Sequence, residues 1–98
     1  MEISEFLDYM RYERRRSQQT LQGYRLDLEA YVAYLDTLEG HVTVDTADTE
    51  DIRGWIEAMM DRGNSPTSIC RRLSAVRSMY RYALARGLVS HDPAHIVR

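Results

Sequence analysis

One segment of the sequence, residues 65–87, collects positive charge and contains no acidic residue. Its basic residues are Arg71, Arg72, Arg77, Arg81 and Arg86. A guanidinium group is permanently charged, and its planar fork of N–H donors matches the paired oxygens of a phosphate. Thr67, Ser74 and Ser78 supply hydroxyl donors on short side chains, which let a helix approach a phosphate backbone closely. The segment therefore predicts binding to a polyanion, above all to DNA.

A second group of donors lies near the N-terminus, around a predicted helix start. Its members are Arg14, Arg15, Arg16, Ser17, Thr20 and Arg25. A serine before a helix caps one free N–H group, and the other N–H groups of the first turn can bind a phosphate. Gly23 weakens a helix interior by about 1 kcal/mol, so we expect close approach there by either a ligand or another helix.

The formal net charge of −2 hides a strong separation of charge along the chain. Residues 26–61 hold ten acids and only Arg53, a net charge of −9, whereas residues 62–91 hold six arginines and no acid. All thirteen basic residues are arginine. The alternative to DNA binding is that the arginines pair with these acids across the fold, or that their aliphatic stems cover apolar surface.

No residue pattern predicts catalysis, a cofactor or a metal site. Cys70 is the single cysteine, so neither an internal disulfide nor a zinc quartet is expected. His91 and His95 have the i, i+4 spacing of metal ligands, but no acid or thiol is placed to complete a site. The tyrosines lie on apolar stripes or lack a neighbouring catalytic group. The N-terminus is acidic and no apolar run reaches the length of a membrane span, which favours a cytoplasmic protein with no membrane partner.

Hydrophobic spacing predicts helices throughout and no strand. A first helix begins at Ile3 and fades in the arginine run, and a second follows Ser17 and ends near Gly40. Residues 41–48 form a connector whose valines can pack over the core. A third helix starts at Thr49, has an apolar stripe that includes Met60, and ends at Gly63.

The fourth helix begins at Ser65-Pro66 and ends at Gly87, and Asp92-Pro93 could open a short fifth helix. On a helical wheel its core face holds Ile69, Leu73, Val76, Tyr80 and Leu84. The opposite face holds Thr67, Arg71, Ser74, Ser78 and Arg81, with Arg72 and Arg77 on the flanks. We therefore expect one compact all-α domain over residues 1–98, with a four-helix core to about residue 90 and a linker over 91–98.

These residues resemble a known family. The spacing Ser17-x-x-Thr20-x-x-x-Tyr24-x-x-Asp27-Leu28, the run Arg71-Arg72-Leu73-Ser74-Ala75-Val76-Arg77 and the later Asp92-Pro93 look like the N-terminal core-binding domain of Xer-type and phage-integrase-type tyrosine recombinases. The resemblance covers nearly the whole chain and implies a SAM-like helical fold.

The resemblance implies one arm of a clamp around the double-stranded DNA of a recombination site, and hence association with the nucleoid when the protein is on DNA. The second helix would supply Ser17, Thr20 and Arg25, and the fourth Thr67, Arg71, Ser74 and Arg77. The implied partners are a C-terminal catalytic domain of the same parent chain and other recombinase protomers on DNA. That catalytic domain is missing from this sequence, which has no lysine. We therefore expect no catalysis by this fragment, and we interpret His95-x-x-Arg98 as a coincidental match to a catalytic motif.

Two other functions remain open. A helical protein-interaction module would use the separated acidic and basic segments to bind oppositely charged neighbours. A helix-turn-helix regulator would use the third and fourth helices, but the recognition helix would then run to about 20 residues and the 13–25 segment would go unused. Salt dependence of binding to random duplex DNA separates the protein-interaction module from the other two.

Overall fold

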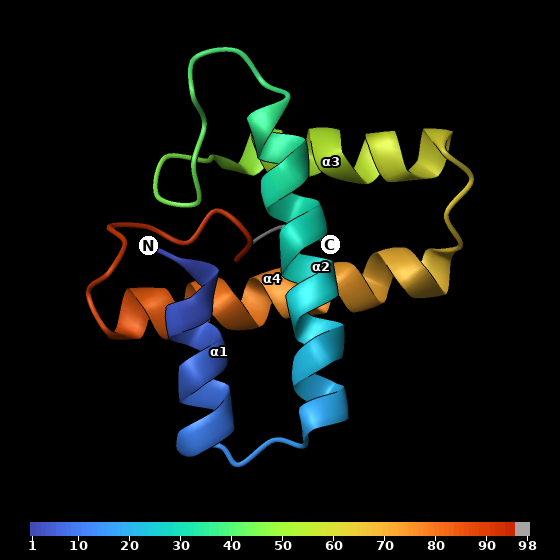
Figure 1. Ribbon diagram of the computed structural model, residues 1–98. Coiled ribbons are helices and arrows are strands. Elements are labelled where there is room, and N and C mark those ends of the chain that lie inside the picture. Colours follow the sequence, from blue (N-terminus) through green and yellow to red (C-terminus); the bar gives the residue numbers. More distant parts are fainter. Residues whose placement is uncertain (96–98) are drawn as a thin grey trace.

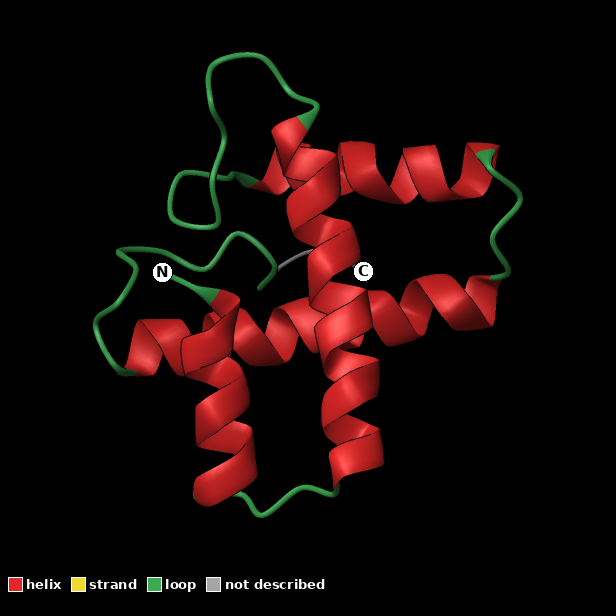
Figure 2. Ribbon diagram, in the orientation of Figure 1, coloured by secondary structure: helices red, strands yellow, loops and turns green. Residues whose placement is uncertain are grey.

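The computed structural model describes residues 1–95, and these residues form four α-helices and no strand (Figure 1). The helices are α1 (Ile3–Tyr12), α2 (Gln18–Asp36), α3 (Thr49–Asp61) and α4 (Pro66–Ala85). Figure 2 shows that loops of unequal length join them, the longest lying between α2 and α3. The all-α prediction is confirmed.

Helix α4 is the centre of the fold, since it contacts α1, α2 and α3. In Figure 1, α1 and α2 cross in front of α4, and α3 runs in nearly the opposite direction to α4 at another level. A DNA-binding helix-turn-helix instead places its two helices at a steep angle. The arrangement of α3 and α4 therefore gives no support to that alternative.

Side-chain caps start the helices close to the predicted positions. The Ser17 hydroxyl accepts a hydrogen bond from the backbone N–H of Thr20 at 3.1 Å, and Ser65 caps α4 in the same way. The third helix was expected to start at Thr49, and its first residue is indeed Thr49. Its cap is the preceding Asp48, whose carboxylate and that of Asp51 each accept from the other's backbone N–H.

The helix ends follow the predicted glycines with one exception. Gly63 and Gly87 follow α3 and α4 in the left-handed region, with φ of +82° and +71°. Helix α2 ends at Asp36, before the expected Gly40, and the Thr37 hydroxyl donates to the Tyr34 carbonyl oxygen at 2.6 Å. Gly40 instead lies in the following turn with φ of +86°.

The buried face of α4 is wider than a single stripe, because three helices pack against it. Met79 and Ala83 are fully buried, whereas Leu84, which we expected in the core, is 45% exposed. Met60, expected on the apolar stripe of α3, is 62% exposed. Wheel geometry identifies one face well but cannot show how far neighbouring helices extend burial around it.

The chain after α4 folds back onto the α2–α3 connector. Val44 is buried, as expected, and its carbonyl oxygen accepts a hydrogen bond from the Tyr80 hydroxyl at 2.8 Å. Imidazole Nε2 of His91 donates to the Ala47 carbonyl oxygen at 3.0 Å. The expected short fifth helix is only a turn over residues 93–95, and residues 96–98, including the arginine of His95-x-x-Arg98, lie outside the described residues.

Candidate nucleic-acid interface

A pocket between α2 and α4, the α2–α4 pocket, brings together predicted binding residues from both helices. It has a volume of about 240 Å³. Its lining residues are Thr20, Gly23, Tyr24, Asp27, Arg71, Ser74 and Ala75. Thr20, Arg71 and Ser74 were all predicted to contact DNA, although Thr20 is more than fifty residues from Ser74 in sequence. The fold therefore places donors from the two basic segments around one depression.

Arg71 is held in this pocket by a buried carboxylate. Its Nε and Nη2 atoms donate to the two carboxylate oxygens of Asp27 at 3.3 and 3.1 Å. Asp27 is 5% exposed, whereas the Arg71 side chain is 62% exposed. Asp27 belongs to the acidic 26–61 segment, so the alternative of pairing across the fold is correct for this arginine. Arg71 nevertheless keeps most of its surface in solvent.

Arg72 lies deeper than its predicted flank position. Its side chain is 29% exposed, its Nη1 atom lies 3.8 Å from the Met59 sulfur, and its Nε atom lies 3.8 Å from Asp27 Oδ1. That Nε atom is buried and makes no hydrogen bond among the described residues. The side chain thus packs where α4 meets α2 and α3.

A second pocket, the α1–α4 pocket, is lined by aromatic and basic residues. It has a volume of about 280 Å³ and shares Tyr24 with the α2–α4 pocket. Its lining residues are Phe6, Tyr9, Met10, Arg14, Arg16, Tyr24, Ser78, Arg81, Tyr82 and Ala85. None of them is acidic. Four predicted binding residues, Arg14, Arg16, Ser78 and Arg81, meet here.

Arg86, which follows α4 as its C-cap residue, has an internal role beside these aromatic residues. The Arg86 guanidinium lies over the rings of Tyr9 and Tyr82, 5.4 and 5.2 Å from their centroids. Its Nη2 atom also donates to the Glu13 carboxylate at 2.9 Å. These contacts hold the end of α4 against α1, and they fit the omission of Arg86 from the predicted DNA contacts.

The loop between α1 and α2 exposes three arginines, and one of them has an uncommon backbone conformation. Arg14, Arg15 and Arg16 are all exposed, and Arg15 has φ of +51°, in the left-handed region that is uncommon for residues other than glycine. The Ser17 hydroxyl, besides capping α2, donates to Thr20 Oγ1 at 2.9 Å. The hydroxyls of Ser17 and Thr20 are exposed at this helix start.

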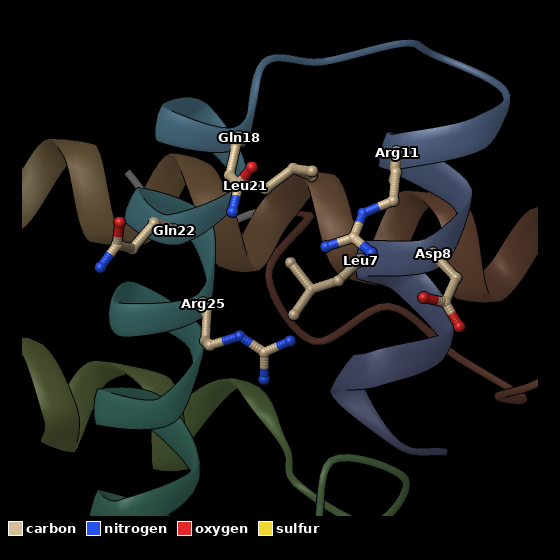
Figure 3. Close-up of a pocket in the computed structure, with 7 residues that line it drawn as sticks. All are labelled: Leu7, Asp8, Arg11, Gln18, Leu21, Gln22 and Arg25. Carbon is tan, nitrogen blue, oxygen red and sulfur yellow. The ribbon is translucent and has the colours of Figure 1, made fainter.

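Three other predicted residues lie outside the two pockets. Arg25 lines a third pocket of about 350 Å³, between α1 and α2, where its guanidinium points into the space toward α1 (Figure 3). Arg25 is five positions after Thr20, about 140° around the helix, so the two cannot share one face. Thr67 is exposed in the first turn of α4, and Arg77 is half-buried.

Sequence reasoning missed Arg11, which lines the third pocket together with Arg25. Figure 3 shows both side chains reaching into the space between α1 and α2. The available signal was the position of Arg11 one turn before the 14–16 run, on the polar side of α1. This pocket also contains Asp8, so its charge is more mixed than that of the α1–α4 pocket.

Gly23 has no packing role. A methyl group at this position would meet no atom within 4 Å, so the helix-packing explanation is wrong. Close approach by a ligand stays a prediction. Gly54 is the glycine that packing requires, because a methyl group there would lie 2.6 Å from the Tyr34 hydroxyl oxygen.

Among the described residues, the side chains whose pKa is clearly shifted are two buried tyrosines, Tyr31 and Tyr80. Burial raises the pKa of Tyr31 and of Tyr80 well above the ordinary tyrosine value. Within residues 1–95, no group of three or more His, Cys, Asp or Glu side chains is placed to hold a metal ion. No described helix is both long and apolar enough to cross a membrane.

Comparison with known proteins gives matches over nearly the whole chain. The chain is 38% identical to tyrosine recombinase XerC of Pseudomonas putida over 94 residues, which cover 96% of this chain and 31% of that protein. It is 34% identical to tyrosine recombinase XerD of Listeria innocua over 91 residues, or 93% of this chain and 31% of the relative. With tyrosine recombinase XerC of Azotobacter vinelandii, the identity is 41% over 95% of this chain and 31% of that protein.

The chain thus spans less than a third of the length of these curated relatives. No solved structure gave a significant match. The family model described as "Phage integrase, N-terminal SAM-like domain" matches residues 3–87, a span that includes all four helices and both pockets around α4. The chain therefore belongs to the family of phage integrase N-terminal SAM-like domains.

Proposed function

We propose that this chain binds duplex DNA through the surface formed by α2, α4 and the α1–α2 loop, mainly by contacts to phosphates. The observation that carries the proposal is the pair of adjoining pockets that share Tyr24. They gather seven predicted donors, and Asp27 is the only acidic residue among their lining residues. A surface of arginines and small hydroxyl residues with so little opposing charge fits a phosphate backbone.

The length of this surface suits a duplex. Arg71, Ser74, Ser78 and Arg81 follow one another along α4 at intervals of three or four residues. Ten residues of helix span about 15 Å, which corresponds to four or five base pairs of DNA. Arg14 and Arg16 extend the surface from the α1 side. Arg72 packs inward, so we assign it a smaller share of the binding than Arg71 or Arg81.

The relatives are named tyrosine recombinases, and the chain covers 31% of their length. We therefore propose that the domain acts in recombination as a non-catalytic clamp on the DNA of a recombination site. Its partners in that role would be a catalytic domain of the same parent protein and other recombinase protomers bound to the site. The isolated chain should neither nick supercoiled plasmid nor form a covalent adduct with it.

A salt titration tests DNA binding. With about five phosphate contacts, the slope of log affinity against log salt should be near −4 to −5. Fluorescence anisotropy with a labelled random duplex, between about 50 and about 200 mM salt, measures this slope. Arg81→Ala should reduce the slope by about one unit.

Arg53→Ala is the matched control, because Arg53 lies on α3 in the acidic segment and pairs with Glu50. It should leave the slope unchanged. A slope near zero, or equal effects of Arg53→Ala and Arg81→Ala, would reject the DNA-binding surface and favour the protein-interaction module.

A further inference from the structure

Asp27 is an acidic residue on a surface whose other charged lining residues are arginines, and it pairs with one of them, Arg71. We propose that Asp27 is a positioning residue, which fixes the Arg71 guanidinium so that its outer edge meets two adjacent acceptors on DNA. Those acceptors are either O6 and N7 of one guanine or two oxygens of one phosphate. The proposal rests on the proposed function and adds how one arginine of the surface works.

The donors of the guanidinium divide cleanly between the two tasks. The group has five N–H bonds in a rigid plane. Asp27 accepts from Nε and from one N–H of Nη2, which lie along one edge of the planar group. The second Nη2 proton and both Nη1 protons remain, and Asp27 is the only side chain among residues 1–95 that hydrogen-bonds the group. A bidentate acceptor can therefore bind the outer edge without displacing Asp27.

The burial of Asp27 makes it an effective anchor. Asp27 is 5% exposed and belongs to α2, which packs against α4, so its carboxylate cannot follow an arginine that turns away. An exposed arginine otherwise samples many rotamers, and ordering it on binding costs affinity. Arg71 is already ordered by two hydrogen bonds while its side chain stays 62% exposed. Binding then loses less conformational entropy.

The surroundings leave room for an acceptor to reach the fork. Gly23, Thr20 and Ser74 share the pocket with Arg71, and a methyl group at Gly23 would still meet no atom within 4 Å. The open space beside Gly23 therefore belongs to the same pocket as the Arg71 side chain. The arginines of the α1–α4 pocket have no acid among their neighbours in that pocket.

Charge and positioning predict opposite effects for Asp27→Asn. A carboxylate on a DNA-binding surface repels phosphates, so its removal should strengthen binding if charge is its only effect. Loss of the anchor should instead weaken binding. We expect Asp27→Asn to weaken binding by roughly 3- to 30-fold at fixed salt, which lies within the range of coupling between contacting residues. The asparagine keeps the shape of the side chain, and circular dichroism and thermal unfolding check the fold.

The test is a double-mutant cycle. It compares four proteins: the unaltered chain, Asp27→Asn, Arg71→Ala and the double variant. The probe is a duplex that the unaltered chain enriches from a random pool, measured by fluorescence anisotropy. Asp27→Asn should weaken binding in the original background and have no further effect when Arg71 is alanine. Equal or tighter binding by Asp27→Asn, or the same loss in both backgrounds, would overturn the proposal. If the unaltered chain bound no duplex, the proposed function would fail and this inference with it.

A second variant keeps the test decisive if Asp27→Asn is poorly folded. Arg71→Lys retains the charge but has no planar fork. We expect it to lose about as much affinity as Arg71→Ala, and full retention of affinity by lysine would overturn the proposal. Substituting 7-deazaguanine or methylphosphonates in the duplex distinguishes the two acceptors. The contribution of Arg71 should vanish with one of them, and persistence with both would also overturn the proposal.

Discussion

The Tyr31–Tyr80 and Asp27–Arg71 contacts both join α2 to α4, and they differ in charge and in exposure. The hydroxyl oxygens of Tyr31 and Tyr80 are 2.6 Å apart, and both side chains are fully buried. One turn earlier on α2, Asp27 pairs with Arg71 at the surface of the same helix pair. The first contact is neutral and enclosed, whereas the second is charged and open to solvent on the arginine side.

The difference separates a contact that serves the fold from one that can also serve a ligand. Tyr80 donates its single hydroxyl proton to the Val44 carbonyl, so Tyr31 must donate to Tyr80. Each buried proton therefore has an acceptor, and neither hydroxyl has a donor left for another molecule. Arg71 uses only two of its five N–H groups on Asp27. An incompletely used donor set at the surface points to binding more clearly than charge alone.

The largest loss of stability should come from truncating an apolar side chain of α2 that lies between these two polar contacts in sequence. Leu28 is fully buried and follows Asp27 directly. Leu28→Ala should lower the free energy of unfolding by about 2–5 kcal/mol through cavity formation, as measured by urea denaturation. Leu26→Ala is the control, because Leu26 is 61% exposed and should change stability little. Equal effects would mean that α2 faces the core differently from the structure.

The buried contact between Tyr31 and Tyr80 should affect the stability of the fold and not its affinity for DNA. Tyr80→Phe removes the donor to the Val44 carbonyl and the acceptor for Tyr31. Leaving these buried groups unpaired should cost about 1–3 kcal/mol of unfolding free energy. Duplex affinity of the folded variant should match the unaltered chain. Tyr12→Phe, at a 70% exposed position, serves as the control for removing a hydroxyl. A selective loss of DNA affinity in Tyr80→Phe would contradict the division between the two links.

The same pair predicts alkaline sensitivity. Burial raises the pKa of Tyr31 and Tyr80, whereas tyrosines of the unfolded chain ionise near pH 10. The folded state then binds more protons than the unfolded state, so stability is complete below about pH 10 and falls above it. The fall should approach about 1.4 kcal/mol per pH unit for each tyrosine.

Urea denaturation between about pH 9 and about pH 11 measures this fall, and Tyr31→Phe should reduce its steepness. Ultraviolet absorbance should show that Tyr31 and Tyr80 ionise only on unfolding. Ionisation of Tyr31 and Tyr80 in the folded chain would show that the pair is accessible to solvent.

Loss of the Asp27–Arg71 contact at the surface should have the smallest effect on stability. Arg71→Ala leaves the buried Asp27 carboxylate with Arg72 Nε at 3.8 Å as its nearest cation, and should cost about 1 kcal/mol. Arg81→Ala removes an exposed side chain of a pocket without acids and should stay within about 0.5 kcal/mol. Thermal unfolding of both variants sharpens the comparison. Equal destabilisation would show that Asp27 does not depend on Arg71.

The sequence predicted the helices well because their limits are set locally. Ser17 and Ser65-Pro66 start α2 and α4, and Gly63 and Gly87 follow α3 and α4, each through residues within one turn. The errors concern features that depend on packing. Leu84 lies on the edge of the apolar arc, and only the positions of α1, α2 and α3 around α4 decide that Ala83 is buried in its place.

The candidate site was predictable in composition but not in grouping. Charge segregation identified both basic segments, whose residues meet in the pockets around α4. The pairing of Asp27 with Arg71 joins residues 44 apart in sequence and follows from how α2 lies on α4. Wheel positions are relative to one helix axis and do not contain that information, which is also why Arg72 lies deeper than its predicted flank position.

The return of the chain after α4 has a mechanical consequence. His91 is tied to the Ala47 carbonyl, and the Thr49 hydroxyl donates to the Pro93 carbonyl at 3.0 Å. A force applied at residue 95 is therefore borne first by these two tethers and by the start of α3. Helix α4, which carries half of the arginines proposed to hold DNA, is shielded from that load until the tethers give way.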